Sequence, residues 1–149
     1  MKTLLIYNSI HKGNTEKVAK KIAEVLGADL KKPSEIGVGE LADYDLIGFG
    51  SGIYGGLFHA SVLKFISELP DMAGKKAFAF FTCSIVVKPF SMNIINLLKK
   101  KNFNIVGDFG CQGSSTWHPF GFTLNVFKGH PNEKDLVAAE KFARWLKIE

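Results

Sequence analysis

The side chains best placed to do chemistry lie near the N-terminus, in the segment Ser9–Thr15. This segment follows a short apolar run typical of a buried strand and leads into a pattern typical of a helix. The first backbone N–H groups of a helix have no internal partner, and the helix dipole places partial positive charge on them. Hydroxyl and amide side chains can donate hydrogen bonds to an anion, and a glycine lets the backbone fold closely round it. The segment therefore predicts a phosphate site, for which the candidate residues are Ser9, His11, Lys12, Gly13, Asn14 and Thr15.

The spacing of this segment resembles the phosphate loop of the flavodoxin family, which runs from a Ser or Thr to Gly-Asn-Thr and holds the phosphate of FMN. Here the loop reads Ser-Ile-His-Lys-Gly-Asn-Thr, one residue longer than the commonest flavodoxin version. A plainer interpretation of Gly13 and Asn14 is a turn whose Asn caps the helix. The loop by itself leaves both interpretations open.

A second glycine-rich segment, Gly50–His59, follows the third apolar run. Its first six residues match GxGxxG, but the dinucleotide fingerprint of that form follows the first strand, opens directly into a helix and precedes an acid at a strand end. Here the nearby acids Glu68 and Asp71 lie at the end of a predicted helix, so we reject the dinucleotide interpretation. Glycines at these positions would instead let backbone groups approach the edge of a flavin ring, on which Tyr54 or Phe58 could stack.

Two longer stretches extend the resemblance to essentially the whole chain, namely Ser51–Gly56 before a helix and Gly129–Leu136 leading into the last helix. Together they are similar to a short-chain flavodoxin-like family. The resemblance implies a flavodoxin fold, noncovalently bound FMN, and transfer of one or two electrons. From the second loop, the residues assigned to the cofactor site are Ser51, Gly52, Ile53, Tyr54 and Gly55.

The loop Thr82–Phe90, after the fourth predicted strand, departs from the best-known flavodoxins because it lacks the Tyr that typically covers the outer face of the flavin. Phe90 or Trp117 would have to serve instead, and each could equally belong to the core. We favour Trp117, because its Ser, Thr, His and Pro neighbours are typical of a surface loop. With Trp117, the remaining candidate cofactor residues are Thr82, Cys83 and Ser84.

Five apolar runs of strand type alternate with amphipathic helical patterns, which indicates a parallel sheet covered on both faces. The predicted strands are Lys2–Tyr7, Ala28–Lys32, Asp45–Phe49, Lys75–Thr82 and Asn104–Phe109. The predicted helices are Thr15–Leu26, Ala60–Leu69, Ser91–Lys101 and a last helix capped by Asn132. Right-handed crossovers leave few topologies, and the doubly wound order 2-1-3-4-5 places a ligand between the carboxyl ends of the first and third strands. We therefore expect one α/β domain over residues 1–149, a flavodoxin-like three-layer α/β/α arrangement in which the two glycine-containing loops meet.

The composition, with 46% hydrophobic and 22% charged residues in 149, is that of a globular domain with a real core. No segment is long and apolar enough to span a membrane and no signal-peptide pattern is present, so we expect a cytoplasmic protein. The net charge of +5 is unusual beside the many strongly acidic flavodoxins. Nearly all of the positive charge is lysine, with Arg144 the only arginine, which argues against specific nucleic-acid recognition.

Cys83 and Cys111 have neither a CxxC nor a zinc-ligand spacing, and we expect no metal site. Both end predicted strands that should be neighbours. We expect these thiols to be reduced in the cell but close enough to form a disulfide on exposure to air.

Two function classes remain, because the intact phosphate loop argues against a third, a flavin-free fold used only for binding. The first is an FMN-binding electron carrier that shuttles electrons between redox partner proteins, as a monomer or weak homodimer, with no catalytic side chain of its own. The second is an FMN-dependent reductase of quinones, porphyrinogens or similar aromatic substrates, favoured by the basic charge, the missing Tyr and the long aromatic loop. A response-regulator receiver is excluded because Asn8-Ser9 and Gly50-Ser51 replace its acids, and a Walker P-loop is excluded because Gly-Lys-Ser/Thr is absent.

Overall fold

Strands and helices alternate along most of the chain. The computed structural model describes residues 1–149 other than 11, 87, 114, 118–123 and 127–128, and the backbone alone for 88, 115–117 and 124–126. The strands are β1 (Thr3–Asn8), β2 (Asp29–Lys31), β3 (Leu46–Tyr54), β4 (Leu57–Phe58), β5 (Lys76–Cys83), β6 (Asn104–Gln112), β7 (Ser115–Trp117) and β8 (Leu124–Val126). The helices are α1 (Asn14–Leu26), α2 (Ala60–Ser67), α3 (Lys88–Lys100) and α4 (Glu133–Leu146), with short 3-10 helices at Pro33–Glu35 and Val38–Asp43.

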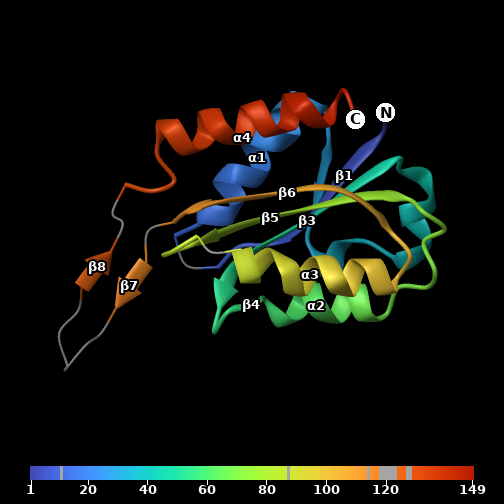
Figure 1. The fold of residues 1–149 in the computed structure, drawn as a ribbon, viewed down its shortest axis with the longest axis horizontal. Coiled ribbons are helices and arrows are strands. Elements are labelled where there is room, and N and C mark those ends of the chain that lie inside the picture. The colour runs from blue at the N-terminus through green and yellow to red at the C-terminus, as the bar shows by residue number, and fades with distance from the viewer. Residues whose placement is uncertain (11, 87, 114, 118–123, 127–128) are drawn as a thin grey trace.

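The main sheet is parallel and its strands lie in the order β2-β1-β3-β5-β6. Counted along the chain, these five parallel strands have the order 2-1-3-4-5, so the predicted doubly wound topology is confirmed. Figure 1 shows α1 and α4 on one face of the sheet and α2 and α3 on the other, which confirms the three layers. Three short strands were not predicted: β4 pairs antiparallel with the end of β3, and β7 and β8 form a separate hairpin.

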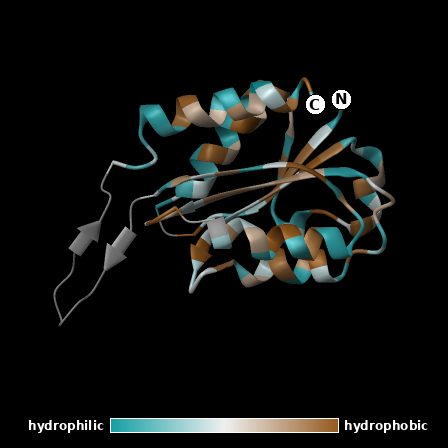
Figure 2. Cartoon of the chain, viewed as in Figure 1, coloured by the Kyte–Doolittle hydropathy of each residue, from teal (hydrophilic) through white to brown (hydrophobic). Residues whose placement is uncertain are grey.

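Side chains on the two faces of the sheet form two separate apolar clusters. In β1, Leu4 and Ile6 belong to the cluster beneath α2 and α3, and Leu5 and Tyr7 belong to the cluster beneath α1 and α4. Strands that are buried on both faces need apolar residues at nearly every position, which is why they appear in the sequence as continuous apolar runs. Figure 2 shows this pattern as hydrophobic strands between helices of mixed colour.

The helix ends follow the capping signals in the sequence. Gly27 ends α1 with a φ of 64°, and the Asn132 side chain caps α4 by accepting a hydrogen bond from the Asp135 N–H at 3.0 Å. α3 begins at Lys88 rather than at the predicted Ser91, because Pro89 is tolerated in the first turn of a helix. Within the part of the chain that the structure describes, no helix could cross a membrane.

β3 continues to Tyr54, well beyond its predicted end at Phe49. Gly50 and Gly52, which made this stretch look like a loop, are strand residues, and Gly50 gives room to an aromatic ring of β5. A Cβ on Gly50 would lie 2.1 Å from Cζ of Phe80, its register partner on β5. The GxGxxG pattern is therefore partly a consequence of packing within the sheet.

Candidate functional site

The carboxyl ends of β1, β3, β5 and β6 lie at one edge of the sheet, because these strands are parallel. The turn of the β3–β4 hairpin, the start of α3 and the β7–β8 hairpin lie toward the same end of the molecule (Figure 1). The loops that were predicted to form the site therefore leave the sheet at one place.

The segment after β1 leads through Gly13 into the N-terminus of α1. Gly13 has a φ of 68° and is the N-cap of α1, and the Ser9 hydroxyl accepts a hydrogen bond from the Glu16 N–H at 3.1 Å. Since Gly13 and not Asn14 occupies the cap position, and the capping side chain is that of Ser9, the interpretation as a plain Asn-capped turn is wrong. His11 lies outside the described residues.

Thr15, in the first turn of α1, reaches the end of β5. Its hydroxyl lies 2.8 Å from that of Thr82, and both side chains are buried. Two hydroxyls that share one hydrogen bond use only one of their two hydrogens, so the accepting member of the pair keeps a donor for an anion. The structure thus brings together two predicted site residues that are 67 positions apart.

Asn14 packs against the segment that follows β6. A Cβ on Gly113 would lie 2.8 Å from Asn14 Nδ2, so the Asn14 side chain would have to shift if another residue replaced the glycine. The Gly113 N–H also donates to the Cys83 carbonyl at 3.0 Å and continues the β5–β6 pairing. Gly113 was not predicted as part of the site, because no local sequence signal links it to Asn14.

The second predicted loop is a tight hairpin. Gly55 and Gly56 have φ values of 58° and 82°, and they connect β3 to β4 by a two-residue turn that requires positive φ at both positions. Ile53 and Tyr54 are the residues of β3 that pair with β4. The predicted glycine loop is therefore the end of β3 followed by a two-residue turn.

Tyr54 connects the β3–β4 hairpin to the segment between β1 and α1. Burial raises the pKa of its hydroxyl, and a hydrogen bond with the Ile10 backbone opposes that shift. Its ring meets the His59 ring edge-on at 5.6 Å, and its oxygen would lie 2.7 Å from a Cβ on Gly52. The expectation that the loops after the first and third strands meet is therefore confirmed.

Two other residues of this region serve the interior. Phe58 is buried and packs against Phe81 with ring centroids 6.2 Å apart, so the prediction that it stacks on a ligand is wrong. The buried Ser51 hydroxyl donates to the Gly52 carbonyl at 2.6 Å and accepts from the His59 N–H at 2.8 Å. Its hydrogen bonds hold the end of β3 against the start of α2.

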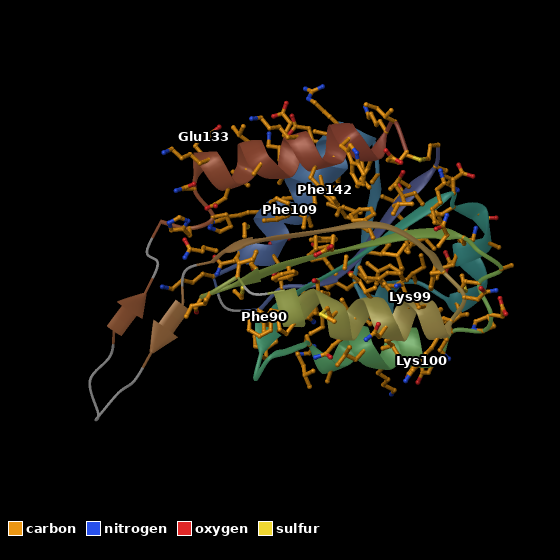
Figure 3. All side chains as sticks on the ribbon, in the orientation of Figure 1. Phe90, Lys99, Lys100, Phe109, Glu133 and Phe142 are labelled. Atoms are coloured by element: carbon orange, nitrogen blue, oxygen red, sulfur yellow. The ribbon has the colours of Figure 1, made fainter. Side chains whose placement is uncertain are left out.

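The loop after β5 contains the remaining candidates. The Cys83 thiol donates to the Ile85 carbonyl at 3.0 Å, and the half-buried Ser84 follows it in the same turn. Phe90 is half-buried, with its ring 6.4 Å from that of Phe81, at the end of α3 nearest β4 (Figure 3). Trp117 ends β7, and its side chain lies outside the described part of the structure.

Cys83 and Cys111 are not placed for a disulfide. They lie on neighbouring strands, but Cys83 packs against the cluster beneath α2 and α3, whereas Cys111 belongs to the cluster beneath α1 and α4. The sheet separates the two thiols, and the expected pairing on oxidation is wrong for the folded protein. Burial raises the pKa of Cys83 to about 11 and that of Cys111 to about 12.

Asn8, at the end of β1, was not predicted as a site residue. Its Oδ1 is buried and has no hydrogen-bond partner among the described residues. A buried acceptor of this kind is costly unless a donor reaches it. In the sequence, only its position immediately before Ser9 pointed to a role of Asn8 in the candidate site. The same described part of the chain contains no group of His, Cys, Asp or Glu that could hold a metal ion.

Comparison with known proteins identifies the family. Residues 4–145 match the model of a flavodoxin domain. A protein of Methanocaldococcus jannaschii described as uncharacterized is 42% identical over 146 residues, which are 97% of each chain. Among solved structures, oxidised flavodoxin 2 from Bacillus cereus has a TM-score of 0.74 at 22% identity, covering 97% of this chain and 96% of that one. A flavodoxin from the domain Archaea has a TM-score of 0.72 at 18% identity, covering 96% and 94%. The chain therefore belongs to the flavodoxin family, whose cofactor is FMN.

Proposed function

We propose that this protein is an FMN-binding electron carrier that passes electrons between redox partners. The observation that carries the proposal is the convergence of Ser9, the Gly13 turn and the Thr15–Thr82 pair at the N-terminus of α1. Together they offer backbone N–H groups, hydroxyls and a favourable dipole to one phosphate. When bound, FMN supplies the redox chemistry, and the protein supplies binding, burial and control of the potential.

The residues at the edge of the sheet fit the rest of FMN as well as its phosphate. The unpartnered Asn8 Oδ1 is an acceptor suited to a hydroxyl or ring N–H of the ligand. Tyr54, at the end of β3, brings an aromatic ring to the same edge. We assign FMN binding to the predicted residues that follow β1 or lie at the carboxyl ends of β3 and β5, to Trp117, and additionally to Asn8 and Gly113.

The alternative function, an FMN-dependent reductase of aromatic substrates, has one observation in its favour. A cavity of about 440 Å³ lies beside the ends of β5 and β6, lined in part by Ile85, Val86 and Phe109. This volume is in the range of small-molecule sites. Stopped-flow oxidation of the reduced protein by a series of quinones distinguishes the two functions, because a substrate site gives rates that saturate with quinone concentration, and a carrier gives rates that rise linearly.

The first test of the proposed function is flavin binding. The purified protein should show a flavin absorption spectrum, and the released flavin should be FMN. Asn14→Ala should weaken FMN binding about tenfold or more, because a hydrogen bond to a charged group is lost, and should leave riboflavin binding nearly unchanged. Asn96→Ala, at an exposed position of α3, is the matched control. Equal loss of affinity for both flavins would contradict the phosphate assignment.

A further inference from the structure

The cavity beside the ends of β5 and β6 combines an acid with apolar side chains. It has a volume of about 440 Å³ and is bounded by the first two turns of α4, the end of β6 and the loop that follows β5. Of the lining residues that the structure describes, only Asp135 has a carboxylate, and none of them is basic. In a chain with a net charge of +5, the cavity wall is therefore negative.

The structural role of Asp135 uses only one of its two oxygens. Oδ2 accepts the Asn132 N–H at 2.7 Å, which belongs to the capping box of α4, and the same oxygen lies 2.6 Å from His130 Nδ1. A neutral imidazole can donate through Nδ1, so this contact does not require the pair to lose its negative charge. Within the described part of the chain, Oδ1 is the oxygen left for a donor in the cavity. The side chain is only 18% exposed, so its charge is weakly screened by water.

Two neighbouring residues of β6 complete the polar part of the wall. Burial, and after it the charge of Asp135, raises the pKa of the Cys111 thiol to about 12, so this lining group is neutral near pH 7. Gln112 adds an amide, whose Nε2 donates to the Ser84 carbonyl at 3.4 Å and whose own carbonyl is a second acceptor. A carboxylate beside an amide carbonyl suits a ligand that is a cationic donor of hydrogen bonds.

The rest of the cavity is lined by aromatic and aliphatic side chains. The Phe109 ring is stacked on that of Phe142 with centroids 5.6 Å apart, between α4 and the sheet (Figure 3), which fixes its orientation. Ile85 and Val86 line the cavity from the loop after β5, with exposed fractions of 63% and 44%. A flat ligand that covered these side chains would remove apolar surface from water.

We propose that this cavity binds a small planar molecule that carries an amidinium or guanidinium group on an aromatic ring. The cationic group donates hydrogen bonds to Asp135 Oδ1 and to the Gln112 carbonyl. The ring lies against Phe109, Ile85 and Val86, which line the same cavity. The site is distinct from the candidate phosphate site at the N-terminus of α1, and its ligand binds whether or not the protein carries electrons.

The test uses the ¹⁵N-labelled full chain and three probes of nearly the same shape: cationic benzamidinium, neutral benzamide and anionic benzoate. Titration followed by the NMR shifts of backbone amides gives the dissociation constant and the location of each probe. Benzamidinium should shift the amides of residues 110–112 and 135–138 in a saturable manner. Benzamide should bind about tenfold more weakly or worse, because a hydrogen bond between charged groups is lost. Benzoate should not bind, because Asp135 repels it.

A fourth probe, methylguanidinium, tests the apolar part of the cavity. It has the planar charge of an arginine side chain but no ring, so it leaves Ile85 and Val86 exposed. We expect it to bind about tenfold more weakly than benzamidinium. Equal affinity of the two cations would overturn the assignment of a ring-bearing small molecule and indicate an arginine of another protein instead.

Asp135→Asn removes the charge of the cavity and keeps an oxygen that can accept the Asn132 N–H. It should weaken benzamidinium binding about tenfold or more. The matched control is Glu133→Gln, which removes the same charge from an exposed residue in the first turn of α4. It should change the affinity less than about twofold, because the field of an exposed charge is screened by water and salt.

Ala138→Leu tests the cavity without changing its charge or the capping box. Ala138 lines the cavity, whereas Val137, the exposed residue before it, does not. Ala138→Leu should abolish benzamidinium binding, and the control Val137→Leu should leave it unchanged. Leucine is a good helix former, so both substitutions suit α4, and far-UV circular dichroism checks that each variant keeps its helices.

Equal effects of Asp135→Asn and Glu133→Gln, benzoate binding as tight as that of benzamidinium, or unchanged binding in Ala138→Leu would overturn the proposal. The absence of saturable shifts in the wild-type chain at millimolar benzamidinium would overturn it as well. The proposed FMN function is tested separately, by the flavin spectrum of the same sample recorded before the titration.

Discussion

The position of a residue in the sheet decides which apolar cluster its side chain joins, as Cys111 illustrates. It ends up beneath α1 and α4, and its neighbour across the strand pair, Cys83, ends up beneath α2 and α3. Side chains alternate between faces along a strand, so two residues on adjacent strands share a face only if their register permits it. Thr82 is the register partner of Cys111, and Cys83 is displaced by one residue and therefore points to the other side.

The buried Cys111 thiol predicts a loss of stability at alkaline pH. Burial raises its pKa from 9.0 to about 12, so the folded state holds this proton more tightly than the unfolded chain. The resulting stabilisation is fully present below about pH 9 and is lost as the pH rises toward 12, by up to about 1.4 kcal/mol per pH unit. Urea unfolding at about pH 8 and about pH 10.5 should show that the wild type loses on the order of 1–2 kcal/mol more than Cys111→Ala.

The control for the alkaline effect is a variant without a titrating group at the changed position. Ile94→Val, in the buried face of α3, should lower the free energy of unfolding by the same amount at both pH values. A Cys111→Ala variant whose stability changes with pH in parallel with the wild type would show that the thiol does not retain its proton through folding.

The candidate site could be predicted residue by residue only where a local pattern pointed to it. Ser9, Thr15 and Thr82 could be proposed because hydroxyls at strand and helix ends are a local signal, and the structure joins Thr15 and Thr82 directly. Asn8 and Gly113, which we propose to add to the site, could not be predicted, because the burial of Asn8 and the close approach of Gly113 to Asn14 depend on contacts distant in sequence. The role of Phe58 was misjudged for the same reason.

At the scale of elements, glycines of one strand face phenylalanine rings of the neighbouring strand. Gly48 and Gly50 of β3 face Phe78 and Phe80 of β5, and a Cβ on either glycine would lie within 2.6 Å of the facing ring. A further case is Gly110 of β6, where a Cβ would lie 2.3 Å from Cζ of Phe81. The rings cover the glycines of the adjacent strand, so the centre of the sheet is filled although many of its residues have no side chain.

This arrangement predicts that Gly50→Ala is strongly destabilising. The added methyl group would meet the ring of Phe80, a fully buried side chain, and overpacking of this kind costs about 1–3 kcal/mol. Combining it with Phe80→Leu should recover part of the loss, because the smaller side chain vacates the space. Chemical denaturation measures each free energy of unfolding.

Gly39→Ala is the control for Gly50→Ala, because a Cβ there meets nothing within 4 Å and the backbone does not have positive φ. It should be near neutral. If Gly50→Ala were equally neutral, β3 and β5 would have to be packed less tightly than the structure has them.

The order of the five parallel strands could be predicted, because each is an apolar run long enough to be recognised and right-handed crossovers restrict the topology. The strands β4, β7 and β8 could not, since two or three residues show no periodicity. The extension of β3 through Gly50 and Gly52 was missed because strand propensity scores glycine without regard to the ring that covers it. The existence of each long strand could thus be predicted from the local sequence, whereas the length of a strand depended on how it packs against its neighbours.

At the scale of the whole molecule, charge sets the expected potential of the bound flavin. A flavodoxin with acids around its cofactor makes the anionic reduced flavin costly by repulsion between like charges. Here the net charge is +5. The four segments at the candidate site, 8–15, 50–59, 82–90 and 111–130, contain no Asp or Glu. Repulsion on the reduced flavin should therefore be smaller, although ring burial and stacking still oppose the charge.

We therefore expect the bound flavin to take up its second electron at a higher potential than in an acidic flavodoxin. Each ~1.4 kcal/mol of reduced repulsion raises a one-electron potential by roughly 59 mV, and screening of exposed lysines reduces the effect without changing its sign. Anaerobic redox titration of the FMN-loaded chain measures the potential. Leu57→Glu, which places an acid on the hairpin, should lower it more than Val137→Glu, which adds the same charge on α4. Equal shifts in the two variants, or a second potential as low as that of an acidic flavodoxin, would mean that burial and stacking outweigh local charge in this site.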